Sequence, residues 1–249
     1  MPFLQLLPPV VNVSAYFDDP VAASLVDLLF QHAPLRLAVF SVLTHSATAV
    51  NAEHNGDIRE AHLAKDDVES LRSLGPNGAA AVDLLVKLYA SPVDAAEALR
   101  GEVGEQFWHR VAESILGDFP HTAREGQYQI GARVVPETPG IGPIDVLGTS
   151  ETGAITLEVK ASVRHPNGRV RRQIRGHLAD AAISERTLHF RPLWYLAVYS
   201  GSKEARAALR QHRLVPDDRV LGRERFVRAE DFVRRRCGLS LPAPLEASG

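Results

Sequence analysis

The stretch Ile155-Thr156-Leu157-Glu158-Val159-Lys160 decides the fold that we expect for this chain of 249 residues. Apolar and polar side chains alternate along it, which is the pattern of a β-strand that buries one face. The alternation sends Glu158 and Lys160 to the same face, roughly 6–7 Å apart along the strand. A carboxylate and an ammonium at this spacing can engage one ligand together, so the stretch predicts a site as well as a fold.

The residue type at position 160 also carries information. Only four of the 28 basic residues are lysines, so arginine supplies most of the positive charge in this chain. Arginine holds its proton at any accessible pH, whereas lysine is a compact charge whose pKa the environment can adjust. A lysine at this position therefore favours a chemical role over a plain surface charge.

An aspartate precedes the motif at a short distance. Asp145 lies in a second strand-like run, residues 144–147, fifteen positions before Lys160. If the two strands pair side by side, the carboxylates of Asp145 and Glu158 can share a divalent cation, and Mg²⁺ takes oxygen ligands of this kind. We therefore predict Asp145 and Glu158 as ligands of Mg²⁺ or Mn²⁺. Lys160 is predicted to orient the attacking water or to stabilise the developing anion.

The segments around this motif alternate between helical and strand patterns. A helix is expected over residues 103–116, because Phe107, Val111 and Ile115 form one apolar stripe. Three strand-like runs follow, then a basic helix, a strand apolar enough to be buried on both faces, and a further helix. The expected ranges are 128–135, 144–147, 154–161, 169–182, 193–199 and 203–212. This order predicts a mixed α/β domain with a central sheet over residues 101–240, and a flexible tail at 241–249.

The first hundred residues have a different pattern and predict a small α-helical domain over residues 1–100. Asp19 followed by Pro20 is typical of a helix start, and the apolar spacing continues to residue 30. Residues 35–50 suit a buried helix, although a strand over 37–43 stays open as an alternative. Further helices are expected at 57–74, 79–89 and 91–100, with a turn at 75–78, where glycine and proline gather.

The aspartate, the gap and the Glu-x-Lys pair resemble the PD-(D/E)xK nuclease superfamily, which has the restriction-endonuclease-like fold. The matching residues are Ile144-Asp145 and Glu158-Val159-Lys160, and the order of elements over residues 103–200 agrees with the family core. The small residues after the lysine look like those of the Holliday-junction-resolvase and RecB-like branches. The resemblance implies a mixed central sheet flanked by helices, and a metal-dependent nuclease that hydrolyses phosphodiester bonds in DNA.

Two features depart from the family pattern. Many family members carry a glutamate on the first helix, and Trp108 stands where that glutamate would fall. Glu105 lies one turn earlier, about 60° away around a helix, and we predict it as the substitute catalytic acid. Glu113 is about 140° away and ranks lower. The proline that usually comes directly before the aspartate lies one position earlier, at Pro143.

Charge divides the chain unevenly. From Lys160 to the end there are 19 basic and 9 acidic residues, whereas residues 1–159 hold 9 basic and 21 acidic ones. Such a split suggests that the C-terminal part faces a polyanion, although the two parts could instead dock on each other. The side chains predicted to contact DNA follow the lysine and are Ser162, Arg164, Arg171, Arg172, Gln173 and Arg175. Gln173 is included because the resemblance implies a glutamine on this helix, and the arginines because they bind phosphates.

Other interpretations of the same residues stay open. Glu-x-Lys is often an exposed pair on an edge strand, and an arginine-rich helix is often only a solvated face. The departure at Trp108 allows a catalytically inactive nuclease-fold protein that binds DNA or takes part in an assembly. An unrelated α/β protein, whose acidic and basic parts pack together, is the third alternative.

The composition limits which cellular compartment and which binding partners we expect for this protein. Cys237 is the only cysteine, which excludes an intramolecular disulfide and a cysteine-based zinc site. The first residues lack the positive region of a secretory leader, and no run approaches the roughly 18 apolar residues of a membrane span. We therefore expect a cytoplasmic protein that binds DNA and no membrane, with a homodimer left open.

Overall fold

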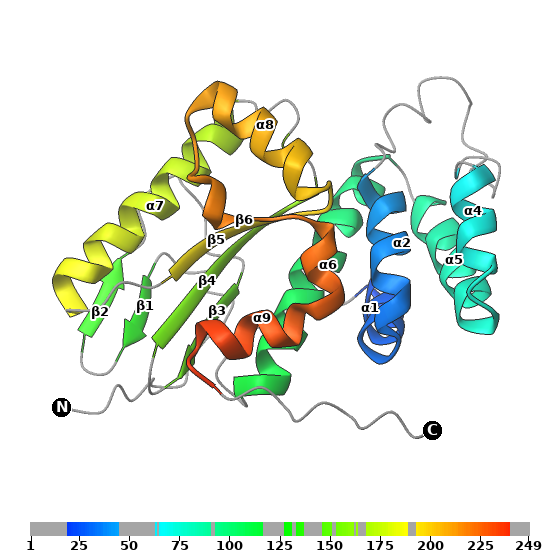
Figure 1. Cartoon of the computed structure of the whole chain (residues 1–249), viewed down its shortest axis with the longest axis horizontal. Helices are drawn as coiled ribbons and strands as arrows, with labels where there is room; N and C mark the ends of the chain where they lie inside the picture. The colour runs from blue at the N-terminus through cyan, green and yellow to red at the C-terminus, as the bar shows by residue number, and fades with distance from the viewer. Residues whose placement is uncertain are drawn as a thin grey trace.

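We describe the protein from a computed structural model, which covers residues 19–44, 63, 65–90, 93–116, 127–130, 133–136, 146–150, 153–161, 163, 168–188 and 193–239. A sheet with the strand order β3-β4-β5-β6 lies at its centre. The strands are β3 (Val146–Ser150), β4 (Gly153–Lys160), β5 (Leu193–Val198) and β6 (Val220–Leu221). β3 is antiparallel to β4, whereas β4, β5 and β6 are parallel to one another (Figure 1).

Helices cover both faces of this sheet, which confirms the mixed α/β class. The apolar side chains form two clusters, one on each face. The cluster on the first face includes residues of α6 (Val93–Leu116) and α9 (Ala229–Arg236). The cluster on the second face includes residues of α7 (Gly168–Leu188) and α8 (Ser202–His212).

Along β4 and β5, alternate side chains belong to opposite faces of the sheet, as the sequence predicts. Ile155, Leu157 and Val159 of β4 are buried in the cluster with α6 and α9. Leu196 of β5, which pairs with Glu158, is buried in the cluster with α7. Residues 194–199 are all buried, so the prediction of a strand covered on both faces is confirmed.

A second, smaller sheet precedes the first in the chain. β1 (Gln127–Ile130) and β2 (Arg133–Pro136) pair in an antiparallel ladder. The single strand expected over residues 128–135 is therefore wrong, because this range holds two strands. Gly131 lies between them in the sequence, and glycine inside a strand pattern often marks an interruption.

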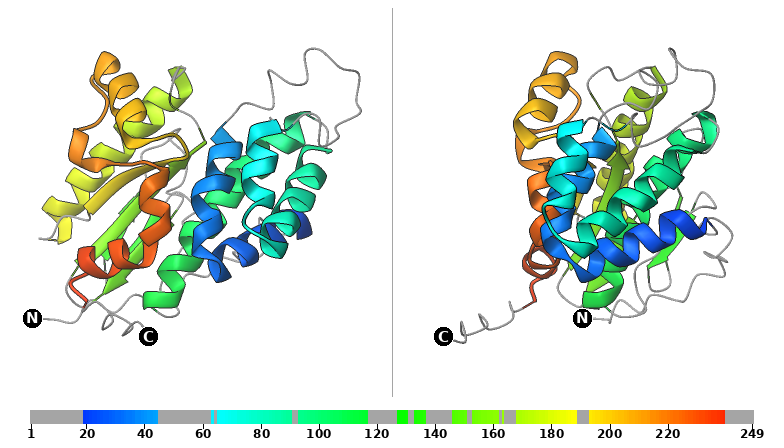
Figure 2. Two further views of the ribbon diagram at one scale, coloured as in Figure 1. Left: turned by 45° about the vertical axis from the view of Figure 1, so that its right-hand side comes forward. Right: turned by 90° about the vertical axis from the view of Figure 1, so that its right-hand side faces the viewer.

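The described residues of the N-terminal part are mainly helical, as predicted. Its helices gather on one side of the sheet, with α6 between them and the strands (Figures 1 and 2). They are α1 (Pro20–Gln31), α2 (Ala33–Thr44), α4 (Lys65–Arg72) and α5 (Pro76–Tyr89). Asp19 caps α1, because its carboxylate accepts hydrogen bonds from the backbone N–H groups of Val21 and Ala22 at 2.8 and 3.0 Å. No helix in the described ranges has the length and apolar character that crossing a bilayer requires.

The helix predicted to begin at residue 35 is confirmed by α2, whereas its strand alternative and one predicted turn are wrong. Residues 37–43 lie within α2, so the strand alternative fails. The turn expected at residues 75–78 is the beginning of α5: Pro76 is its first residue, and Gly75 precedes it with a φ of 81°. Proline suits a first helical turn because its fixed φ is helical and its missing N–H has no partner there anyway. The predicted segments 45–50, 57–62 and 241–249 lie outside the described residues.

Helix α6 joins the N-terminal helices to the sheet without interruption. It runs from Val93 to Leu116, although we expected one helix to end near residue 100 and another to begin near residue 103. The boundary that we predicted between residues 100 and 101 thus falls inside a helix. Side chains of α1, α2, α5, α6, β4 and β5 belong to one continuous apolar cluster. Glycine lowers helix propensity by only about 1 kcal/mol, so packing against both neighbours outweighs Gly101 and Gly104.

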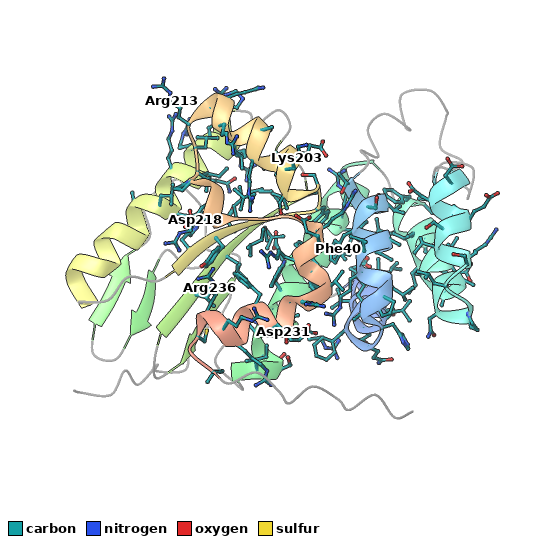
Figure 3. The ribbon with its side chains drawn as sticks, in the orientation of Figure 1. Phe40, Lys203, Arg213, Asp218, Asp231 and Arg236 are labelled. Atoms are coloured by element: carbon teal, nitrogen blue, oxygen red, sulfur yellow. The ribbon has the colours of Figure 1, made fainter. Side chains whose placement is uncertain are left out.

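Aromatic rings fill the junction between the N-terminal helices and the sheet. Phe40 of α2 lies 5.4 Å from Phe107 of α6, 4.9 Å from Tyr199 and 4.5 Å from Phe226, measured between ring centroids. Phe226 belongs to η4 (Arg223–Arg228), a 3₁₀ helix between β6 and α9. Rings from segments far apart in the sequence therefore meet at one place, and Phe40 is labelled there in Figure 3.

A buried arginine crosses the same junction. Arg36 of α2 is only 2% exposed, and its guanidinium lies 5.1 Å from the ring centroid of Phe107. It donates hydrogen bonds to the carbonyl oxygens of Leu29 and Phe30 at the end of α1, at 2.8 and 3.1 Å. It also donates to both carboxylate oxygens of Glu230 in α9, at 2.7 and 2.6 Å. Arg36 therefore ties α1 and α2 to the C-terminal helix.

We expect Glu230→Gln to destabilise the protein by about 1–2 kcal/mol, because it removes a charge-assisted partner from a guanidinium that stays buried. Chemical unfolding in urea measures this change as a lower midpoint. Glu113→Gln is the matched control, since Glu113 is exposed on α6 and should leave the midpoint in place. Equal midpoints for both variants would show that the carbonyl groups alone satisfy Arg36.

Gly104 and Gly101 on α6 give a paired test of the junction. The hydroxyl of Tyr199 accepts a hydrogen bond from the Gly104 N–H at 2.8 Å and donates one to the Arg100 carbonyl at 2.5 Å. A Cβ at Gly104 would lie 2.3 Å from that hydroxyl oxygen, whereas a Cβ at Gly101 would meet nothing within 4 Å.

We therefore expect Gly104→Ala to lower stability by about 1–3 kcal/mol through overpacking. Gly101→Ala should raise stability by about 0.5–1 kcal/mol, because alanine is the better helix former. Thermal unfolding of the two variants tests the pair. The close packing of Tyr199 on α6 would be contradicted if both substitutions moved the midpoint in the same direction.

Candidate functional site

Glu158 lies on the face of β4 that is covered by α7, and it is almost completely buried, at 1% exposed. One of its carboxylate oxygens, Oε1, contacts the Nζ atom of Lys160, which is two residues further along the strand. The other oxygen, Oε2, lies 2.9 Å from Nε2 of His177, whose side chain is also 1% exposed. The predicted pairing of Glu158 and Lys160 on one face is thus present, and His177 completes a group of three.

These neighbours decide the charge of the carboxyl group. Burial by itself raises the pKa of Glu158, because a charge is poorly solvated in the interior. The Lys160 ammonium and the His177 ring act in the opposite direction and outweigh burial, so the pKa of Glu158 lies below its ordinary value. The site therefore holds an ionised carboxylate in a place where an unpaired carboxyl group would be neutral.

His177 was absent from the predicted site. It lies on α7 one turn after Ile174, which is buried, and beside Leu178, which packs against the same cluster. The helical spacing of Val170, Ile174 and Leu178 places His177 next to the apolar stripe, so its burial could have been inferred. Its contact with Glu158 depends on how α7 crosses β4, and the sequence pattern does not contain that angle.

The ring of His177 has an unused position. Its Nδ1 atom is buried and has no hydrogen-bond partner among the described residues. Buried polar atoms in folded proteins nearly always have a partner in the protein or in ordered water. His177 therefore contacts the Glu158 carboxylate through Nε2, whereas its Nδ1 atom is enclosed by the protein.

The structure does not place Glu105 beside this group. Glu105 is partly buried on α6, which packs against the opposite face of the sheet from α7. Its charge acts instead on Tyr199, whose pKa is raised above the ordinary value first by burial and then by Glu105. Trp108, where the family glutamate would fall, is fully buried and packs 5.1 Å from Phe226, centroid to centroid.

The remaining predicted residues fall into two groups. Asp145, Ser162 and Arg164 lie outside the described residues. The others are all on α7, the helix that carries His177, where Arg172 and Arg175 are exposed while Arg171 and Gln173 are partly buried. This helix therefore presents arginine side chains to solvent and His177 to the buried carboxylate.

The described residues fit a divalent cation only in part. Glu158 supplies a carboxylate of the kind that Mg²⁺ and Mn²⁺ prefer, but both of its oxygens already contact cationic or polar groups of the protein. Within the described ranges no group of three or more histidine, cysteine, aspartate or glutamate side chains could hold a metal ion. A metal would therefore need a further ligand from outside those ranges, and Asp145 is the residue that we predict for it.

Comparison with known proteins gives no family. No family model matches the sequence, and no curated protein matches it. Protein VC1899 from Vibrio cholerae, known from a crystal structure, superposes with a TM-score of 0.46 and 14% sequence identity. The superposition covers 88% of this chain and 57% of that one, so this chain spans little more than half the length of VC1899. At this level the likeness supports no conclusion about function.

The lowered pKa of Glu158 makes a pH-dependent contribution to stability. An ionised, paired carboxylate stabilises the fold fully above its unfolded pKa, about 4.5, and the contribution is lost as the pH falls through the lower folded value. We expect Glu158→Gln to reduce the free energy of unfolding by roughly 3 kcal/mol at pH 7, because Lys160 and His177 lose their anion. Urea unfolding at several pH values should show this difference shrinking toward pH 3. A difference that stays constant with pH would mean that Glu158 is not ionised in the folded protein.

Proposed function

We propose that this protein is a metal-dependent nuclease that acts on DNA, with a restriction-endonuclease-like arrangement of its central sheet. The observation that carries the proposal is the Glu158 carboxylate, held ionised and buried at 1% exposure between Lys160 and His177. Burying a charge is costly unless it is paired, so such a group is a candidate for chemistry.

The proposal makes a definite demand on the neighbouring strand. In the antiparallel pairing of β3 with β4, Val146 is opposite Leu157. Asp145 comes directly before Val146 in the sequence, and the proposal requires the same register to continue for one residue, so that Asp145 is opposite Glu158. Opposite residues on an antiparallel pair have Cβ atoms about 4.5–5.5 Å apart on one face, which suits two carboxylates that share a cation.

Each residue of the group has a distinct role in the proposed reaction. Asp145 and Glu158 supply carboxylate oxygens, and Lys160, with its side chain 19% exposed, is the member of the group that reaches solvent. From there Lys160 can orient the attacking water or stabilise negative charge on the phosphate. His177 is a positioning residue, because it holds the second oxygen of Glu158 in place. A bound Mg²⁺ or Mn²⁺ would lower the pKa of the water and neutralise charge on the phosphate.

The outer face of α7, which is turned away from Glu158, suits a polyanion. Arg172 and Arg175 are exposed on α7, the helix that brings His177 to Glu158. Arginine binds phosphate oxygens as a planar fork, which positions a nucleic-acid backbone without selecting its sequence. The excess of basic residues after position 160 agrees with the same role.

A second function is favoured by one specific observation. Both oxygens of Glu158 contact groups of the protein itself, and Trp108, which replaces a family acid, is sealed in the apolar cluster. A protein that keeps the nuclease fold for DNA binding or assembly, without cleavage, would have such a closed group. Cleavage and binding must therefore be measured on the same variants.

The deciding experiment is cleavage of plasmid DNA and of labelled linear and branched DNA in the presence of Mg²⁺ or Mn²⁺. We expect Lys160→Ala and Asp145→Ala each to lower the cleavage rate by roughly 10²-fold or more, because each removes a charge that stabilises the reaction. Lys203→Ala, an exposed lysine on α8, is the matched control and should cleave at the wild-type rate. Circular dichroism verifies that every variant is folded.

The outcome separates the two functions. Salt-dependent DNA binding without cleavage by the wild type would favour the binding protein over the nuclease. Cleavage that is equal in wild type, Lys160→Ala and Asp145→Ala would assign the activity to other residues.

A further inference from the structure

A cavity of about 440 Å³ lies at the edge of the sheet, beside β6. β6 is the outermost strand in the order β3-β4-β5-β6, so the cavity is two strands away from β4. Its walls come from α8, η4 and α9 and are rich in arginine. The arginines are Arg206, Arg225, Arg228, Arg235 and Arg236. Figure 3 shows the labelled side chains of Asp218 and Arg236 in this region, between α8 and α9.

The cavity has an excess of positive charge. Five arginines and two aspartates, Asp218 and Asp231, line it, which leaves three formal positive charges uncompensated. Asp218 also lies 3.7 Å from Arg219, a further arginine that is outside the cavity wall. Clustered like charges repel one another, so a concentration of arginines at one cavity favours the binding of an anion.

Arg206, on the α8 side of the wall, has one unsatisfied donor. Its Nε atom is buried and has no hydrogen-bond partner within the described part of the chain. A buried donor on a charged group is costly to leave unpaired, and folded proteins seldom do so.

Aromatic rings hold one of the lining arginines, Arg236, in position. The guanidinium of Arg236 lies 5.6 Å from the ring centroid of Tyr195 and 5.8 Å from that of Phe232. Arg219 is 5.2 Å from the same tyrosine ring, and Tyr195 itself is buried. Such cation–π contacts hold a guanidinium in place without using its N–H donors. Arg236 is therefore preorganised and still able to donate hydrogen bonds to a ligand.

We propose that this cavity binds a small molecule of nucleotide size that carries two or more phosphate groups. Arginine forks match phosphate oxygens in geometry and charge. A terminal phosphate carries roughly 1.5–2 negative charges near pH 7, so a diphosphate balances the excess of the lining. The cavity volume lies in the range of sites for small ligands, about 300–1,000 Å³. The proposal is independent of the nuclease proposal, since Glu158 faces α7 and the cavity adjoins α9.

Isothermal titration of the 249-residue chain with inorganic pyrophosphate and with adenosine diphosphate tests the cavity. We expect saturable binding of both, and a loss of roughly tenfold or more in affinity for the double variant Arg228→Gln/Arg235→Gln, because charge-assisted hydrogen bonds are removed. Both side chains are exposed, so the variant should fold, and Arg225→Gln is a second variant on the same wall. Lys87→Gln removes an exposed charge from α5 and should bind like the wild type.

Two further arms distinguish the ligand and the site. Lys160→Ala should bind both phosphates normally, which separates this cavity from the proposed nuclease centre. A short DNA duplex, titrated against the same variants, shows whether the arginines serve a nucleic-acid backbone. The proposal is overturned if neither small phosphate binds, if the arginine variants bind them as tightly as the wild type, or if only the duplex responds to those variants.

Discussion

The burial of one charge, the guanidinium of Arg36, constrains the rest of the molecule. A desolvated guanidinium must find acceptors for its N–H groups, and Arg36 finds them in carbonyls at the end of α1, in η4 and in the carboxylate of Glu230. These partners lie as far as 194 positions along the chain, so the C-terminal segment has to return to α2. That return sets Phe226 into the aromatic junction and places α9 against the sheet. Most of the arginines that line the cavity lie on the same two elements, η4 and α9, that Arg36 binds.

Glu158 is a buried negative charge that, like the buried positive charge of Arg36, requires partners within the protein. Its carboxylate stays ionised only because Lys160 and His177 accompany it, and these come from β4 itself and from α7. The crossing of α7 over β4 is therefore specified by charge as well as by apolar packing. The sheet accordingly separates two chemical environments: a buried carboxylate between Lys160 and His177 toward α7, and a cavity with an excess of arginines at the β6 edge.

Local patterns in the sequence predicted much of this fold and part of the site. The alternation at residues 155–160 predicted the two faces of β4, and the Asp19-Pro20 pair predicted the start of α1, because both depend on neighbouring residues alone. Local patterns were insufficient at positions whose structure depends on residues far away in the sequence. The predicted helix over residues 103–116 contains Gly104, but the local pattern does not show why this residue must be small: the ring of Tyr199, 95 positions later, packs against it. The two residues of β6 and the contact of His177 with Glu158 likewise depend on the packing of separate elements. Glu105 was predicted from helix geometry, which gives its angle around α6 but not the face of the sheet that α6 covers.

The uninterrupted course of α6 has a mechanical consequence. One rigid rod of 24 residues passes from the N-terminal helices to the underside of the sheet, with Phe107 and Trp108 set among rings from both regions. A rod of that length transmits rotation, so a tilt at one end displaces the other end by an amount that its roughly 36 Å of length amplifies. The N-terminal helices and the sheet should accordingly unfold in one cooperative transition. A displacement of the N-terminal helices would also shift the strands.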